Sequence, residues 1–76
     1  MPSVLALDQG TTGSTALVFS SDARVLGRGY REFAQHFPQP GWVEHDPQEI
    51  WEVTVAAARD AMATAGEIPS AIGITN

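Results

Sequence analysis

The 76-residue sequence contains neither cysteine nor lysine. The lack of cysteine excludes a disulfide-stapled fold, a cysteine-based zinc site and a thiol nucleophile. Nine acidic side chains face only four arginines, which gives a formal charge of -5. This balance disfavours a nucleic-acid binder, because neutralising phosphates requires a basic patch. Long apolar runs are missing too. The run 4–7 is too short to span a membrane and no basic segment precedes it, so we expect no membrane contact and a cytoplasmic location.

The composition itself is that of a folded segment. Hydrophobic residues make up 43% and charged residues 17%, which argues against disorder. A chain of this length hides only about 60% of the surface that its unfolded form exposes, so its core is marginal. The expected last strand also reaches Asn76, although α/β sheets bind ligands just beyond the carboxyl ends of their strands. We therefore expect residues 1–76 to be an incomplete domain from a longer protein.

Three strands are predicted in the first half of the chain. The continuous apolar run 3–7 is typical of a strand buried on both faces. Residues 15–19 and 25–33 form the second and third candidates, and short connections favour an antiparallel meander. Gly27 and Gly29 weaken the third strand and indicate a bulge or a close backbone approach.

The second half predicts a helix and a final strand. The prolines of the loop 34–46 exclude a helix there. Asp46 can cap a helix of about residues 47–65, Glu49 stands where a capping box places its acid, and Gly66 suits a left-handed stop. A strand at about 71–75 then favours a parallel, right-handed crossover. The predicted class is α/β, a mixed sheet in the order β-β-β-α-β with one main helix.

The predicted helix carries a wide apolar face, rich in small residues, that suits close packing against a sheet. Two adjacent stripes form it: Ile50, Val53, Ala57 and Ala61, and Trp51, Val55, Ala58 and Met62. Trp42 in the loop and Trp51 in the helix are expected to anchor these segments to the core.

The turn 8–15 is the first candidate for chemistry. A carboxylate at a strand end, Asp8, can hold a hydrated Mg²⁺ through oxygen. The glycines Gly10 and Gly13 allow backbone amides to approach phosphate oxygens. Hydroxyl donors for the same oxygens are Thr11, Thr12, Ser14 and Thr15. The turn is not a P-loop, since it lacks the Gly-Lys-Ser/Thr ending and leads into a strand. On spacing alone, an ordinary hairpin turn with self-bonded side chains is the simpler interpretation.

A second candidate is the stretch Glu44-His45-Asp46. These side chains could be drawn as metal ligands, or His45 as an acid–base group. Three consecutive residues rarely converge on one ion, and capping already explains Asp46. We therefore predict no metal here, and a surface or packing role for His36.

Two stretches resemble the amino-terminal segment of glycerol kinases, which belong to the FGGY carbohydrate kinases. These are Asp8-Gln9-Gly10-Thr11-Thr12 after an apolar strand, and Pro-Gly-Trp-Val-Glu-His-Asp-Pro at 40–47. The resemblance covers essentially the whole chain and favours the phosphate-binding interpretation of the turn. It implies a ribonuclease-H-like fold of the actin-like ATPase superfamily.

The same resemblance implies ATP-dependent phosphorylation of glycerol to sn-glycerol 3-phosphate with Mg²⁺, by a full-length protein that is a homo-oligomer. Asp8 would lie near the metal, and Gly10, Thr11, Thr12, Gly13 and Ser14 would line the nucleotide phosphates. The general base and the glycerol contacts would lie outside this segment, so no catalytic base is assigned and the segment alone is expected to be inactive.

Two positions depart from the family pattern. Gly13 stands where the family usually has a serine, and Thr15 where it usually has an arginine, so the arginine's role is not carried over to Thr15. Other functions stay open: another FGGY sugar kinase, an actin- or Hsp70-like ATP-binding module whose output is conformational, or a small domain without a ligand.

Overall fold

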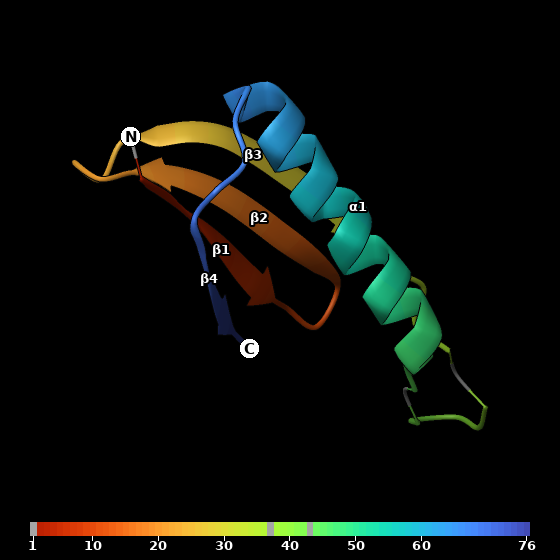
Figure 1. Cartoon of the computed structure of the whole chain (residues 1–76). Helices are drawn as coiled ribbons and strands as arrows, with labels where there is room; N and C mark the ends of the chain where they lie inside the picture. Colours follow the sequence, from red (N-terminus) through yellow and green to blue (C-terminus); the bar gives the residue numbers. More distant parts are fainter. Residues whose placement is uncertain (1, 37, 43) are drawn as a thin grey trace.

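The computed structural model describes residues 2–36, 38–42 and 44–76. Four strands, β1 (Ser3–Gln9), β2 (Gly13–Ser20), β3 (Val25–Glu32) and β4 (Ala71–Thr75), form one sheet in the order β3-β2-β1-β4. The helix α1 (Pro47–Ala65) lies across one face of this sheet, over β2 and β3 (Figure 1). The predicted β-β-β-α-β order is confirmed.

The sheet is mixed, as predicted. Strand β1 pairs antiparallel with β2 and parallel with β4, while β2 pairs antiparallel with β3. The first hairpin is longer than the sequence indicated, because pairing continues to Gln9 opposite Ser14. Only residues 10–12 therefore form the turn itself, and Asp8 is a strand residue. Close pairing fixes the direction of its side chain more firmly than a loop would.

Close approach of the helix explains the two glycines of β3. Gly27 and Gly29 lie on the covered face, where an added Cβ at Gly27 would collide with the backbone of Ala61 and Ala65, and one at Gly29 with the carbonyl of Ala57. The predicted bulge is present too, as a register shift at the Val18–Phe19 step of the opposing strand. The sequence indicated a bulge or a close backbone approach, and both features occur in this part of the sheet.

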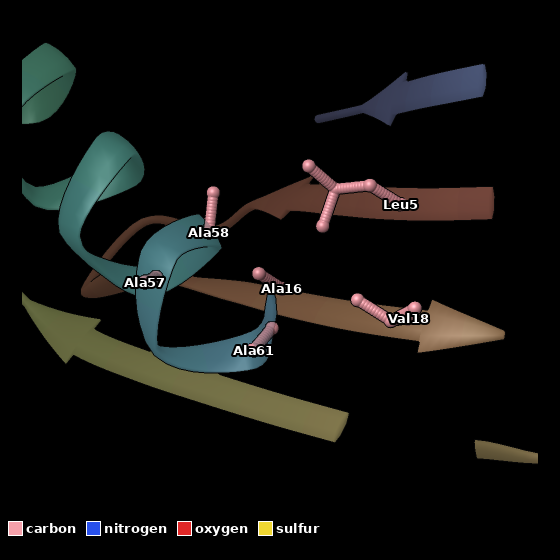
Figure 2. Packing of buried hydrophobic residues seen from close by; sticks show 6 residues of the cluster. All are labelled: Leu5, Ala16, Val18, Ala57, Ala58 and Ala61. Carbon is pink, nitrogen blue, oxygen red and sulfur yellow. The ribbon is translucent and has the colours of Figure 1, made fainter. Parts of the chain in front are cut away.

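The core lies between α1 and the covered face of β1 and β2. Its buried residues are Leu5, Ala16, Val18, Ala57, Ala58 and Ala61. Figure 2 shows the three helix alanines gathered beside Leu5 of β1 and Ala16 and Val18 of β2. Small side chains on both layers bring backbone close to backbone, so the core is thin and holds few large groups.

The helix begins and ends as predicted, with one exception. Asp46 accepts a hydrogen bond from the Gln48 amide at 3.0 Å, and Gly66 ends the helix with a φ of 73°. Glu49, however, does not serve as the acid of a capping box. Its carboxylate accepts from the Ala34 amide at 3.2 Å and therefore ties the preceding loop to the helix. Within the described residues, α1 is not long and apolar enough to cross a membrane.

Two expectations about burial were wrong. Strand β1 is covered on one face only, so Val4 on the other face is 42% exposed. Trp42 and Trp51 do not anchor the core, since they are 56% and 63% exposed. A single helix covers only one side of a four-stranded sheet, and α1 lies over β2 and β3, so the face and edge at β4 stay open.

Candidate functional site

A row of polar side chains crosses the uncovered face of the sheet at the end near the first turn. Asp8 on β1 pairs with Thr15 on β2 and with Thr75 on β4, and Thr15 pairs in turn with Tyr30 on β3. Directly opposed residues of neighbouring strands point to the same face of a sheet. One carboxyl group and three hydroxyl groups therefore stand side by side across all four strands.

The row borders an open hollow of about 350 Å³. Asp8, Thr15 and Thr75 line it together with apolar residues: Ala6, Leu7, Leu17, Gly73 and Ile74. The Asp8 side chain is exposed, and such a placement leaves its oxygens free to meet a ligand from solvent. Polar groups gathered at one end of an apolar hollow are typical of small-molecule sites.

The turn beside this row is tight. The Gly10 amide donates to the Gly13 carbonyl at 2.9 Å, and the Phe33 amide donates to the Thr12 carbonyl at 3.2 Å. These bonds hold the turn against the end of β3. Thr11 and Thr12 are exposed, so their hydroxyls face solvent from a fixed backbone. The structure thus keeps Asp8, Gly10, Thr11 and Thr12 within one short segment.

Ser14 lies on the other face. Its hydroxyl is buried under α1, 2.9 Å from the Thr54 hydroxyl, and it donates to Gln9 Oε1 at 3.2 Å. Thr54 also donates to Gln9 Oε1, at 3.0 Å. Strand alternation separates Ser14 from its neighbours Gly13 and Thr15, which belong to the open face. The Ser14 side chain thus joins the hairpin end to the helix.

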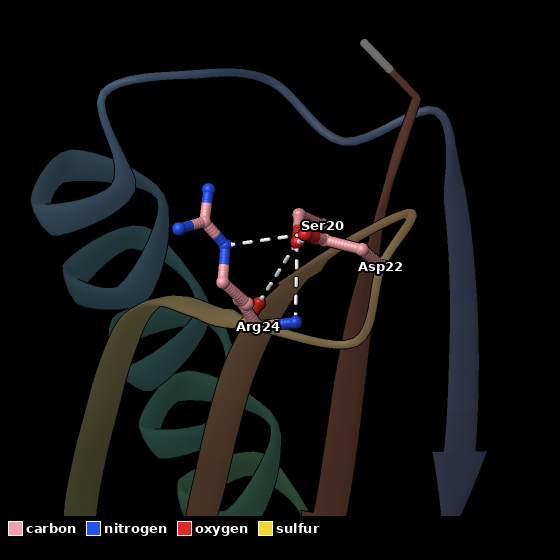
Figure 3. A network of polar contacts seen from close by, with 3 residues as sticks. All are labelled: Ser20, Asp22 and Arg24. Atoms are coloured by element: carbon pink, nitrogen blue, oxygen red, sulfur yellow. Dashed lines mark hydrogen bonds and ion pairs between the residues drawn. The ribbon is translucent and has the colours of Figure 1, made fainter.

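The turn at the opposite end of β2 gives a useful contrast. There the Ser20 hydroxyl bonds the Asp22 carboxylate and accepts from the Arg24 amide at 3.1 Å, while Asp22 pairs with Arg24 Nε at 3.3 Å (Figure 3). These polar groups bind one another. This is the self-bonded turn chemistry that the sequence also allowed for the first turn.

The loop before α1 is held by its own contacts. His36 and Glu44 exchange backbone bonds of 2.8 and 2.6 Å, and His36 Nε2 lies 3.4 Å from Glu49. The ring of His45 packs edge-on against Phe33 with centroids 4.9 Å apart. His36 was predicted as a surface or packing residue, and the sequence did not indicate that Glu49 lies next to its ring. Among the residues that the structure describes, no three His, Asp or Glu side chains cluster as a metal site would require.

One ion pair links the sheet to the helix. Arg31 on β3 reaches Asp60 on α1 through Nε at 2.8 Å and Nη2 at 3.2 Å. This side-chain hydrogen bond, with the attraction between the charges, raises the pKa of Arg31 and lowers the pKa of Asp60. Both side chains stay about half exposed, so the pair contributes little to the stability of the fold.

Two residues of the polar row, Tyr30 and Thr75, are absent from the sequence-based set of site residues. Alternation along β3 places Tyr30 on the face opposite Gly27 and Gly29, and this much was readable from the sequence. Its alignment with Thr15 depends on the register of the second hairpin, which the sequence did not indicate. Thr75 depends in the same way on the parallel pairing of β4.

Residues 3–76 match the model of the FGGY family of carbohydrate kinases, N-terminal domain. The chain belongs to the FGGY family of carbohydrate kinases. Curated relatives agree. Over 79 residues, the whole chain is 56% identical to the glycerol kinase of Methylibium petroleiphilum, of which it covers 16%. The glycerol kinase of Bradyrhizobium diazoefficiens gives the same identity and coverage. The chain therefore corresponds to a small part of these enzymes.

Solved structures of two kinases share the fold. Plasmodium falciparum glycerol kinase, solved with ADP, superimposes with a TM-score of 0.89 at 26% identity, over 100% of this chain and 16% of that one. The xylulose kinase of Rhodospirillum rubrum gives a TM-score of 0.87 at 32% identity, over 95% of this chain and 15% of that one. The actin-like ATPase fold and the incomplete domain that the sequence predicted are confirmed.

Proposed function

We propose that the full-length protein is a glycerol kinase that transfers the terminal phosphoryl group of ATP to glycerol, and that this segment supplies its phosphate-binding turn. The observation that carries the proposal is the polar row that contains Asp8 and lies beside the turn 10–12. Identity of 56% to proteins named glycerol kinase favours glycerol over other polyols.

The chemistry of phosphoryl transfer suits these groups. The transferred group carries charge on its outer oxygens, and catalysis consists largely of positioning and of stabilising that charge. In our proposal, the hydroxyls and the backbone amides of Thr11 and Thr12 donate to nucleotide phosphates, while the Gly10 amide holds the turn through the Gly13 carbonyl. Gly13 and Thr15 border the same face, and Thr15 contributes a hydroxyl where a cation is usual in the family. The Ser14 hydroxyl already has partners under the helix, so it takes no direct part.

Asp8 is the proposed holder of Mg²⁺. A single carboxylate flanked by the Thr15 and Thr75 side chains offers oxygen atoms only, and it opens to a hollow with room for water. That donor set fits Mg²⁺, which binds oxygen and keeps several of its waters. When bound, the ion supplies positive charge beside the phosphates. Asp8 itself orients the hydrated ion from a strand rather than from a mobile loop.

Several parts of this proposal lie outside the segment. We assign no general base within residues 1–76 and expect the segment alone not to phosphorylate glycerol. A homo-oligomeric full-length enzyme and a cytoplasmic location stay predictions from the resemblance. A different FGGY kinase is the second candidate, because xylulose kinases share the fold with comparable TM-scores. Turnover on glycerol against pentuloses separates the two.

The substitution Asp8→Asn in the full-length protein tests the proposal. It keeps the size of the side chain and removes the charge that would hold the ion. We expect kcat for ATP-dependent glycerol phosphorylation to fall about 100-fold or more, as when a charge-stabilising group is removed from other active sites. The thermal unfolding temperature should stay unchanged, since Asp8 is exposed.

Asp22→Asn is the matched control. It makes the same chemical change in the exposed turn at the other end of β2, and activity should remain at the level of the unmodified protein. A wild-type protein that binds ATP without phosphorylating any polyol would support the conformational ATP-binding module instead. Full activity in the Asp8 variant would refute the role of this carboxylate.

A further inference from the structure

Tyr30 stands at the β3 end of the polar row, and its position there is more specific than that of a surface tyrosine. The ring end lies over Gly13. A Cβ added to Gly13 would come within 2.8 Å of the Tyr30 hydroxyl oxygen and 2.9 Å of the adjoining ring carbon. Gly13 is buried although it points to the face that no helix covers. The tyrosine ring therefore covers this glycine.

The absence of a side chain at position 13 is what allows this contact. A Cβ there would also lie 2.6 Å from the Arg31 carbonyl, closer than real Cβ atoms come. Glycine thus lets the hydroxyl end of the aromatic ring come close to the first residue of β2, directly after the turn 10–12. The ring places the phenol hydroxyl beside the turn, and Tyr30 as a whole is 42% exposed.

On the same face, Tyr30 is paired with Thr15, which is paired with Asp8. The Tyr30 hydroxyl, the Thr15 hydroxyl and the Asp8 carboxylate therefore border one surface. Four arginines are the only strongly basic side chains of the chain, and none belongs to this row. A phenol is a good hydrogen-bond donor, and a donor to an ionised acceptor forms the stronger kind of hydrogen bond.

We propose that Tyr30 is a nucleotide-binding residue whose hydroxyl donates to a phosphate oxygen of ATP or ADP held at the turn 10–12. This inference rests on the proposed function and extends it by one residue. Gly13 is the positioning residue in this arrangement, because it admits the ring. The hydroxyl contributes binding without changing charge, so it acts on affinity for the nucleotide rather than on the chemical step.

The test compares Tyr30→Phe with the unmodified full-length protein. Phenylalanine keeps the ring over Gly13 and removes only the hydroxyl. We expect the Kd for MgADP and the KM for MgATP to rise about ten-fold, the lower end for a hydrogen bond to a charged group. The kcat and the KM for glycerol should change less than two-fold. Calorimetric titration with MgADP gives the binding constant independently of turnover.

Two further variants separate binding from packing. Tyr30→Ala removes ring and hydroxyl together, and Val25→Ala alters an exposed residue at the far end of the same strand. If Tyr30 only packs on Gly13, Tyr30→Phe will bind MgADP as the unmodified protein does, and only Tyr30→Ala will lower the unfolding temperature. That result overturns the inference and leaves the proposed kinase intact. A wild-type protein that neither binds MgADP nor phosphorylates glycerol overturns the proposed function itself.

Discussion

The two faces of the sheet are built from alternate residues of the same strands, yet different requirements govern them. On the covered face, Ala16, Gly27 and Gly29 leave just enough room for α1. On the open face, alternate positions carry Asp8 and Thr15, whose side chains meet solvent and a hollow. On the covered face, the residues are those small enough to fit under the helix. On the open face, they are polar groups that can meet a ligand. A substitution in a strand should therefore affect stability if the residue points to the covered face, and activity if it points to the open face.

Among the substitutions on the covered face, Gly29→Ala is expected to lower the free energy of unfolding most. The added methyl group would run into the Ala57 carbonyl and the Asp60 side chain, so the helix must shift or the strand must bend. Overpacking of this kind costs about 3 kcal/mol when backbone atoms obstruct the new group. Denaturant unfolding of the full-length protein measures the loss.

Gly73→Ala is the control for this prediction. A Cβ at Gly73 meets no atom within 4 Å, and unfolding should be almost unaffected. Equal destabilisation by the two substitutions would show that loss of glycine flexibility, rather than contact with the helix, is responsible. The contrast between the faces would then be wrong at this position.

The sequence predicted the covered face better than the open one. The alanines of α1 and the two glycines of β3 predict that the helix packs closely on the sheet, because larger side chains would keep the two backbones apart. The capping by Asp46 and Gly66 was equally readable from local chemistry. The exposed Trp42 and Trp51 were misjudged, because a large aromatic residue was assumed to be buried within this segment.

The open face could be predicted only in part. Asp8 and the turn residues are adjacent in sequence, so their grouping is visible there. Tyr30 and Thr75 join them only through strand pairing, which depends on register. Ser14 shows what spacing leaves out in the other direction. It stands in the middle of the motif, but alternation turns its hydroxyl to the covered face. The sequence spacing therefore identifies the motif, but it does not show to which face of the sheet each side chain points.

Ser14→Ala sharpens the comparison from within the motif. If Ser14 serves the covered face, the substitution removes a buried hydroxyl that bonds Gln9 and Thr54, and it should cost about 1 kcal/mol of unfolding free energy. The KM for MgATP should stay unchanged. Thr15→Val, one residue further, should show the reverse pattern, with nucleotide binding weakened and stability kept. A raised KM without lost stability in the Ser14 variant would place its hydroxyl at the phosphates.

Asp60→Asn should give the smallest effect, because Arg31 and Asp60 pair at the exposed border of the covered face. The pKa of Asp60 is lowered by its hydrogen bond to Arg31. The pair therefore stabilises the fold fully above the ordinary aspartate pKa of about 4, and this contribution disappears as pH falls through the lowered value of the folded state. Unfolding curves of variant and unmodified protein should differ slightly at neutral pH and converge in strong acid. Added salt should narrow the neutral-pH difference, since it screens exposed charges. A difference that persists in acid and in high salt would mean that the Asp60 side chain acts by packing against β3, and that shape governs even the rim of this face.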